Sequence, residues 1–453
     1  MQHAGCPGHT AQLRNVLKQR QLLEIQRLPP HVKNQISIAC APFRNVSAFP
    51  SAKPAFVAFQ KDIVLSDTTI PQGGQAMPQG LHFQARSAQE AQNNQSDFCE
   101  LLVRHRLKAH VRTSIQNVDA HHSVRFVLEP SFVERHLPGF DTLHLHQQGD
   151  GVDDGAVQSV KHQILVSLLS SPIALEFPSY SELLSAIHMR ELIVGAARKT
   201  SMAFNTDLVD RPVEHWHYQE DVGFILKPGK SLIEALLLAT QPDRSGRLYG
   251  FSCYRATEYV ILLAIAQEAQ QHNPQLLAEL EVQWQHKAVM SGKFHDVFLH
   301  ELGTNDKPLP TQWFVPGDRV WFRNPDDASS DVPGYEGSWV IYLGHGQFAN
   351  FWHPQEPYDL EGKCLELYHW RHGVYADASG QLKMDEEKVA QRVAQTKKDP
   401  QLTQHICQRM MRLRDPQGVY AEGGCMDNTR ESPRWIHPTT TDIALPIFEK
   451  SNF

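Results

Sequence analysis

Cys253 is the residue whose type and position most directly indicate covalent chemistry. It stands near the start of residues 251–271, where an almost wholly apolar run at 259–266 predicts a helix buried nearly all round. The unpaired N–H groups and the positive dipole of a helix N-terminus favour a thiolate, which is the reactive form of cysteine. The same N–H groups could receive an oxyanion during acyl transfer. The position therefore indicates a thiol nucleophile, and a packed cysteine at a helix start is the alternative.

Strands that could carry a base follow this helix. Residues 317–324 alternate like a strand, residues 338–343 predict a more buried one, and a Gly-His-Gly turn at 344–346 leads to a third at 347–352. A helix with cysteine at its N-terminus, packed on an antiparallel sheet, is the layout of papain-like and NlpC/P60-like thiol enzymes, in which the base faces the helix N-terminus. We therefore predict an α+β fold with such a core.

Further elements are predicted on both sides of this core. Residues 179–199 predict a helix that Ser179 caps, and Glu182, three residues on, matches a capping box. Residues 231–240 predict another helix, and 383–414 predict two short ones. The last forty residues are rich in Pro, Thr and Gly, so we expect them to be irregular.

Three regions are predicted along the chain. Residues 1–165 contain an amphipathic helix at 11–28 and a flexible stretch near 71–97 that is rich in Gln, Gly, Ser and Ala, but no motif that names a function. Residues 166–375 form the thiol-enzyme core. Residues 376–453 form a helical and irregular C-terminal extension.

Composition and charge exclude several classes of function. The net charge of -7 argues against nucleic acid as the main partner. No apolar run reaches the roughly 18 residues of a membrane span, and the N-terminus lacks the apolar segment of a secretory signal. We expect a cytoplasmic protein, or one exported by a route that needs no signal peptide. The seven cysteines are odd in number and lack CxxC spacing, which disfavours a disulfide framework and a zinc site.

Four motifs, in order along the chain, resemble the spore-coat protein-glutamine gamma-glutamyltransferases, the small bacterial transglutaminases. Residues 178–199 resemble the family's first helix, and 248–253 (LYGFSC) resemble its catalytic turn. Residues 316–325 (PGDRVWFRNP) and 337–344 (GSWVIYLG) are similar to its two strand motifs. The strand pair also resembles that of NlpC-type peptidases.

The resemblance implies an NlpC-related α+β fold and a defined reaction. Cys253 would form a thioester from a glutamine carboxamide and pass the acyl group to a lysine or another amine, while water in place of the amine would give deamidation. The partners implied are proteins that bear glutamine and lysine side chains. No metal and no organic cofactor is implied.

Three residues depart from the family pattern. Ser252 stands where the family has Glu before its cysteine, Ser338 where it has the catalytic Glu, and Asn350 where it has a His. Because a serine cannot take a proton from a thiol at neutral pH, the base must come from elsewhere. Glu336 lies two residues before Ser338, so on an extended strand it shares the same face and could stand in.

The sequence also allows a different base and a different function. His345, His353 or Glu258 could pair with the cysteine, assisted by Asn350, and Trp321, Trp339 and Trp352 could wall an acyl-donor cleft. The core could instead be a cysteine amidase or peptidase, or a binding module that lost its base. The predicted site comprises Cys253, Glu336, Asn350 and Ser338.

Overall fold

The computed structural model describes residues 77–118, 121–145, 159–204, 210–415 and 423–447. The chain divides into two units, Met1–Ala76 and Met77–Phe453, and all described residues belong to the second. The helix predicted at 11–28 lies outside them. In the described part no helix combines the length and the apolar character that crossing a membrane requires.

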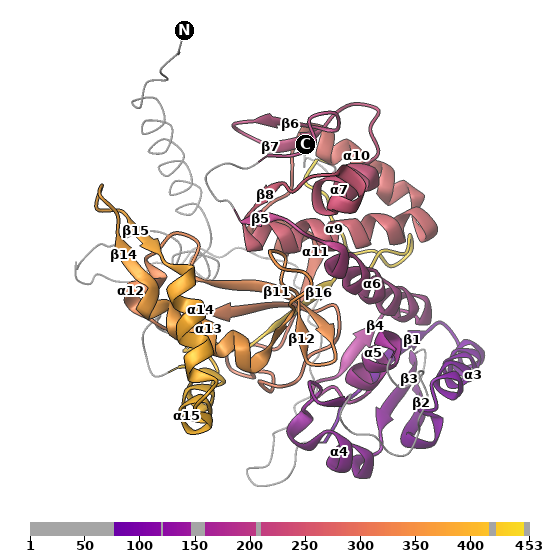
Figure 1. Cartoon of the computed structure of the whole chain (residues 1–453). Helices are drawn as coiled ribbons and strands as arrows, with labels where there is room; N and C mark the ends of the chain where they lie inside the picture. The colour runs from indigo at the N-terminus through magenta and orange to yellow at the C-terminus, as the bar shows by residue number, and fades with distance from the viewer. Residues whose placement is uncertain (1–76, 119–120, 146–158, 205–209, 416–422, 448–453) are drawn as a thin grey trace, which may run out of the picture. The chain divides into compact units, whose positions relative to one another are not determined.

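A four-stranded sheet opens the described part, and helices α3 and α5 contact it (Figure 1). Its order is β2-β3-β1-β4, with β1 antiparallel to β3 and parallel to β4. These elements are β1 (Leu81–Ala85), α3 (Ala88–Arg104), β2 (Val111–Val118), β3 (His121–Leu128), α4 (Pro130–His136), α5 (Val160–Leu169) and β4 (Leu175–Phe177).

The stretch near 71–97, expected to be flexible, contains β1 and the first half of α3. Ser87 caps α3 by accepting a hydrogen bond from the Glu90 N–H, and Phe98 on the helix is fully buried. Its ring lies 4.6 Å from that of Phe126 on β3. The helix therefore depends on widely spaced apolar residues and on packing against the sheet, which a polar composition conceals.

A six-stranded antiparallel sheet carries the predicted strands. Its order is β13-β12-β11-β10-β16-β9. The strands are β9 (Leu299–Leu302), β10 (Arg319–Arg323), β11 (Gly337–Gly344), β12 (Gln347–Phe348), β13 (Tyr358–Asp359) and β16 (Arg430–Pro433). The structure thus confirms an α+β fold, and it confirms strands at both predicted positions 317–324 and 338–343.

The central strands β10 and β11 separate two apolar cores. In their register Trp321 faces Trp339 and Phe322 faces Ser338, so alternate pairs lie on opposite faces. On one face, Ile341 packs in a core with the helices α6, α7, α9 and α10. These helices span Tyr180–Lys199, Leu232–Thr240, Cys253–His272 and Pro274–His286.

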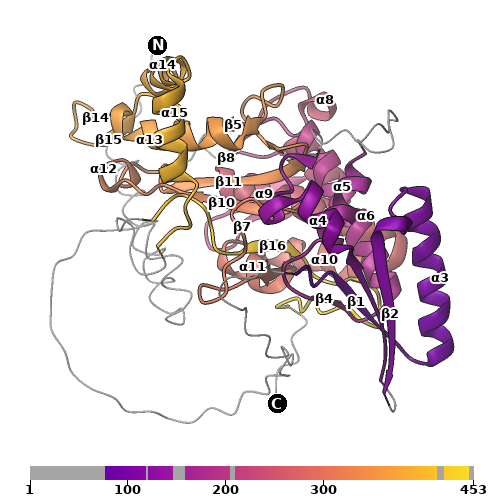
Figure 2. The same cartoon turned by 90° about the horizontal axis from the view of Figure 1, so that it is seen from below.

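On the opposite face, Phe322 and Tyr342 pack against α13 and α15. Figures 1 and 2 show α13, α14 and α15 as a group apart from α6, α7, α9 and α10. Helix α13 spans Leu360–Gly373, α14 spans Glu386–Thr396 and α15 spans Pro400–Met410. Helices α14 and α15 confirm the two short helices predicted within 383–414.

Short elements complete the described part. The strands β5 (Ala203–Phe204) and β8 (Gly250–Phe251) form a parallel pair. Two antiparallel pairs are β6 (Trp216–Gln219) with β7 (Gly223–Leu226), and β14 (Val374–Ala376) with β15 (Leu382–Met384). Three further helices are α8 (Pro242–Ser245), α11 (Gly292–Phe298) and α12 (Asp327–Ser330).

The C-terminal segment is more ordered than predicted. Strand β16 lies between β10 and β9, so residues beyond 375 complete the sheet. Glu182, fully buried on α6, accepts hydrogen bonds from the His437 N–H (2.7 Å) and the Thr440 hydroxyl (2.5 Å). Ser179 caps α6 as predicted, but the Glu182 carboxylate that the capping box assigned to the helix start binds this segment instead.

The third predicted strand, at 347–352, is shorter than expected. Strand β12 ends at Phe348, because the Asn350 side chain closes a turn. Its Oδ1 accepts from the backbone N–H groups of Trp352 (3.3 Å) and His353 (3.2 Å), and its Nδ2 donates to the Glu356 carbonyl (3.0 Å).

Candidate active site

Cys253 is the first residue of α9, as the sequence predicts. Ser252 caps the helix, since its hydroxyl accepts from the Arg255 N–H at 3.4 Å. Just before it, Phe251 pairs in β8 with Phe204 of β5, which fixes the direction from which the chain enters the helix. The serine at position 252 therefore has a structural task, while the thiol at 253 is half-buried.

The Cys253 sulfur lies at an open edge of β11. The Tyr342 N–H donates to Asp318 on the β10 side, whereas the Ile341 carbonyl accepts from Ala349 on the β12 side. Because backbone groups alternate in direction along a strand, the N–H of Trp339 also points away from β10. Strand β12 pairs only with Tyr342 and Gly344, so within the described chain it stops short of Trp339.

Two backbone N–H groups affect the ionisation of the Cys253 thiol. Those of Trp339 and Tyr254 interact with the Cys253 thiol and favour its ionised form. Burial is the larger effect, and together with the negative charge of Glu336 it raises the pKa of the thiol. The resting group is therefore a neutral thiol, which must lose a proton before it can attack.

Glu336 is a carboxylate whose negative charge raises the pKa of the Cys253 thiol. It directly precedes β11, and its Oε1 accepts from the Gly334 N–H at 3.3 Å. Burial raises the pKa of Glu336 above its usual range. A carboxylate with a raised pKa is the better general base near neutral pH, because its protonated form is less acidic.

Ser338 and Asn350 lie close to this region along the sheet. Ser338 pairs with Phe322 and is 9% exposed, on the face of β11 that also carries Val340. Asn350 follows β12, and both ends of its amide are used in the turn described above. In this structure it shapes the chain after β12, and a role in orienting a base stays a prediction.

The alternative bases have partners elsewhere. His345 lies in the turn after β11, where its backbone N–H donates to the Gln163 side chain at 2.8 Å. It is six residues along the strand from Trp339, a separation of roughly 20 Å. The His353 N–H binds Asn350, and its side chain is exposed.

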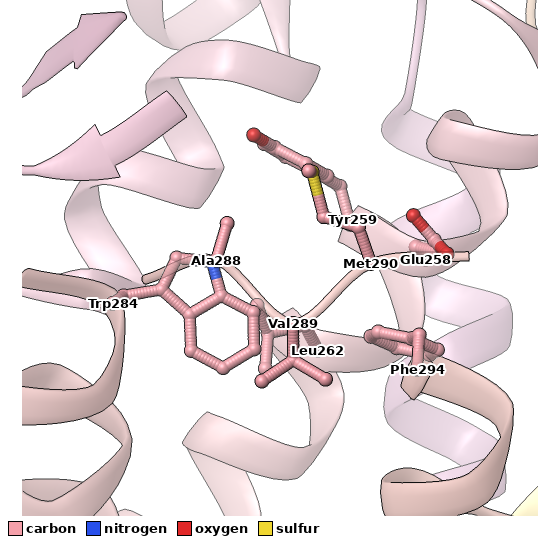
Figure 3. A pocket seen from close by; sticks show the side chains of 8 residues that line it. All are labelled: Glu258, Tyr259, Leu262, Trp284, Ala288, Val289, Met290 and Phe294. Atoms are coloured by element: carbon pink, nitrogen blue, oxygen red, sulfur yellow. The ribbon is translucent and has the colours of Figure 1, made fainter. Parts of the chain in front are cut away.

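Glu258 is also engaged away from the sulfur. Its carboxylate pairs with Arg255 at 2.5 Å and accepts from the Ser291 N–H at 2.8 Å. Figure 3 shows it on the wall of a small apolar pocket that Tyr259 and Trp284 also line. The volume of this pocket is about 10 Å³, room for no more than a single water molecule.

Aromatic rings flank the cysteine. The Trp339 ring stacks on Trp321 with centroids 5.7 Å apart and meets the Tyr254 ring edge-on at 5.3 Å. A second group begins at Phe204, 37% exposed, whose ring lies 5.2 Å from Trp352 and 6.2 Å from Tyr335. Phe204 pairs with Phe251, two residues before Cys253, and Tyr335 directly precedes Glu336 in the chain.

A buried ion pair supports the first aromatic group. The guanidinium carbon of Arg319 lies 4.1 Å from the Trp339 ring centroid and 4.4 Å from that of Tyr254. Arg319 also donates to Thr257 on α9 (2.9 Å) and to Glu431 on β16 (2.9 Å). The cation therefore joins the sheet to the first turns of the cysteine helix.

Lys363 is a buried cation that sequence reasoning missed. It is 2% exposed on α13, and its charge acts on the Cys253 thiol in the direction that lowers the thiol pKa. The only signal in the sequence is a lysine beside Cys364 within a helix, with Glu366 three residues on. That pattern is equally typical of a solvated helix face.

Comparison with known proteins places this site in a family. Residues 142–443 match the sequence profile described as protein-glutamine gamma-glutamyltransferase. The chain belongs to the protein-glutamine gamma-glutamyltransferase family.

Two members of this transglutaminase family are similar to the chain. A protein-glutamine gamma-glutamyltransferase of Halalkalibacterium halodurans is 25% identical over 193 residues, which cover 42% of this chain and 62% of that relative. The chain thus spans less than two thirds of the relative's length. The solved transglutaminase from Geobacillus stearothermophilus, without its C-terminal extension, shares 22% identity over 47% of this chain and 98% of its own, with a TM-score of 0.32.

The family match covers every residue of the predicted site. Cys253, Glu336, Ser338 and Asn350 all lie within residues 142–443. It also covers β16, which the predicted boundary at 375 separates from the core. The residues that match the family profile thus extend beyond the predicted boundary at 375.

Proposed function

We propose that this chain is an active protein-glutamine gamma-glutamyltransferase with Cys253 as its nucleophile. One observation supports this more than any other. Within a chain of this family, the thiol at the start of α9 meets the open edge of β11, where two N–H groups and the Glu336 carboxylate act on its sulfur. A packed structural cysteine needs none of these partners.

The reaction we propose begins with the transfer of the thiol proton to Glu336. The Cys253 sulfur then attacks the carboxamide carbon of a glutamine side chain, and the C–N bond breaks. Protonated Glu336 returns the proton to the leaving nitrogen, so that ammonia departs and a thioester remains. A lysine amine attacks this thioester, loses a proton and forms an isopeptide bond, while the sulfur regains its proton.

The N–H groups beside the sulfur support the charged states of this sequence. Those of Trp339 and Tyr254 are held by the strand and the helix, so they need no rearrangement when negative charge develops. The rings of Trp339 and Phe204 then offer apolar surface for the methylene groups of the glutamine side chain. Protein substrates with glutamine and lysine side chains follow from this chemistry.

We also propose that the core is related to papain-like and NlpC/P60-like thiol enzymes. The support is the arrangement of α9, with Cys253 at its start, against the antiparallel strands β10 and β11. In that arrangement Ser338 directly precedes Trp339 on β11, where it would help to shape the strand rather than accept the proton.

Incorporation of a fluorescent primary amine into a glutamine-bearing protein tests the proposed activity. We expect the full chain to label the acceptor protein and Cys253→Ala to give no labelling. Cys99→Ala is the matched control, because Cys99 is also half-buried but lies on α3, and it should retain full labelling.

Release of ammonia separates the possible outcomes. Ammonia release that depends on Cys253 but leaves no amine on the acceptor protein would identify water as the acceptor and the enzyme as a deamidase. If the full chain neither incorporates amine nor releases ammonia while Cys99→Ala and the unaltered chain are folded, the proposal is wrong.

A further inference from the structure

The backbone at Gly250, three residues before Cys253, is held by two side chains that are neighbours in the chain. The Gly250 N–H donates to the Asp210 Oδ1 at 2.7 Å, and the Gly250 carbonyl accepts from the Arg211 Nη1 at 2.8 Å. Gly250 also pairs in β8 with Ala203 of β5 (Figure 1). The direction of the chain just ahead of the cysteine helix therefore depends on residues 210 and 211.

Arg211 also packs on aromatic rings around this turn. Its guanidinium carbon lies 3.4 Å from the centroid of the Phe251 ring. The same carbon lies 4.8 Å from the ring centroids of Tyr259 and Phe224. Phe251 stands two residues before Cys253, and Tyr259 lies on α9 itself. Because a cation is attracted to the face of an aromatic ring, Arg211 joins the entry turn to the helix that follows it.

The burial of Arg211 has a cost in stability. Arg211 is 5% exposed, and in the part of the chain that the structure describes its guanidinium forms no ion pair and its Nε has no hydrogen-bond partner. By contrast, the buried Arg190 pairs with Asp318, and the buried Arg319 pairs with Glu431. Apolar side chains often replace buried charges without loss of stability. The stability of the fold alone therefore does not account for an arginine at this position.

We propose that Arg211 is a positioning residue of this transferase, which fixes the place of the Cys253 sulfur relative to the reacting carboxamide. The inference rests on the function proposed above and names a further residue that serves the same site. The guanidinium holds the Gly250 carbonyl and the Phe251 ring, and Cys253 follows within three residues at the start of α9. Arg211 acts through the backbone, so it needs no contact with the substrate.

Arg211→Met tests this role, because methionine keeps much of the side-chain length but removes the charge and the donors. The rings around Arg211 suit an apolar, flexible side chain. A misplacement of the reacting groups by about 1 Å can cost about 100-fold in rate, and we expect the partial loss of position here to lower kcat for amine incorporation about tenfold. KM for the glutamine-bearing protein should stay within about twofold, as expected when binding is not affected. The midpoint of unfolding by urea should be unchanged or higher.

Two more variants provide the comparison. Arg211→Lys keeps a cation that can donate to the Gly250 carbonyl but loses the flat guanidinium that stacks on Phe251, so it should recover part of kcat. Arg244→Met removes an arginine on α8 whose side chain is 53% exposed, and it should leave kcat, KM and the urea midpoint unchanged. An arginine that served only stability would lower the urea midpoint on replacement and leave kcat per folded molecule unchanged.

Hydrogen–deuterium exchange reports on the turn without requiring transferase activity. Arg211→Met should speed exchange in peptides that contain Gly250 and Phe251, because local opening of the backbone governs exchange. Exchange in α3, which contacts the four-stranded sheet, should stay unchanged and is the internal control for the rest of the fold.

Asp210→Ala gives a second test of the same turn if Arg211→Met does not fold. The Asp210 side chain is 44% exposed, so the change leaves no large cavity. The Gly250 N–H loses its acceptor, and we expect kcat to fall about threefold and exchange at Gly250 to become faster.

Unchanged kcat in folded Arg211→Met, or unchanged exchange at Gly250 and Phe251, would overturn the role of Arg211. If the unaltered chain incorporates no amine, the proposed function is wrong, and the exchange measurement still decides whether Arg211 fixes the turn before Cys253. The two failures are therefore distinguishable.

Discussion

Replacing Glu431 by Gln should weaken the structure that positions the cysteine. Glu431 lies on β16, where one carboxylate oxygen pairs with Arg319 (2.9 Å) and the other accepts from His295 (2.7 Å). The Arg319 side chain is fully buried, and it contacts both Trp339 and Tyr254 beside the sulfur. A glutamine of the same shape leaves the guanidinium buried without the carboxylate that pairs with it.

The magnitude follows from this burial. Removing one partner of a buried ion pair costs about 3 to 5 kcal/mol, because the remaining charge stays out of water. An exposed pair is worth at most about 1 kcal/mol. Glu129→Gln is the matched control, since Glu129 pairs with Arg112 at 2.6 Å but their side chains are 32% and 61% exposed.

Unfolding by urea, followed by circular dichroism, measures both variants. We expect Glu431→Gln to lose about 3 kcal/mol of unfolding free energy, and Glu129→Gln to lose less than about 1 kcal/mol. Equal losses in the two variants would refute the reasoning that burial of Arg319 decides the effect.

The pH dependence of stability gives an independent check. Burial favours the neutral acid, but Arg319 and His295 outweigh it, so the pKa of Glu431 is lowered in the folded chain. The contribution of Glu431 to stability is present above the unfolded carboxyl pKa of about 4.3 and is lost as the pH falls through the folded value.

His295 gives a second pH dependence. Burial disfavours the charged imidazolium, but Glu431 favours it more strongly, so the pKa of His295 is raised. That contribution is present below about pH 6.5 and is lost as the pH rises through the folded value. In Glu431→Gln the dependence due to Glu431 should disappear and the one due to His295 should be reduced, since burial and Glu301 still act on His295.

Two further changes test the base and the C-terminal segment. Glu336→Gln should lower the rate of amine incorporation about 10²- to 10⁴-fold, as expected for loss of a general base, with little change in the free energy of unfolding. A decrease of less than fivefold in that rate would show that another group takes the thiol proton. Glu182→Gln removes the charge of the carboxylate that binds His437 and Thr440. We expect the unfolding free energy to fall by about 2 kcal/mol and limited proteolysis to cleave first near residue 437. Resistance to proteolysis equal to that of the unaltered chain would show that the hydrogen bonds of Glu182 do not hold the segment.

Local patterns predicted the helices and central strands well. The apolar run at 259–266 is buried along α9, and Ser179 caps α6 where the capping pattern places it. The alternation in Trp321 and Phe322 likewise marks a strand whose two faces enter different cores. These signals succeed because each depends on residues within one or two turns of each other.

Long-range partners could not be predicted in this way. The short strand at Arg430–Pro433 contains little that marks a strand, and it forms because β9 and β10 leave a gap of one strand between them. Glu182 binds a segment more than 250 residues away rather than its own helix start. The buried cation Lys363 is a tertiary feature of the same kind, since its surroundings depend on the position of α13, which follows β13.

The position of β16 has a consequence for the synthesis of the protein. A ribosome delivers β9 and β10 well before Arg430–Pro433, so the nascent chain carries two strands whose inner edges have no neighbour until β16 emerges. Unpaired strand edges invite association with other chains. The sheet therefore stays incomplete, and Arg319 lacks its partner Glu431, until more than a hundred residues after β10 have been translated.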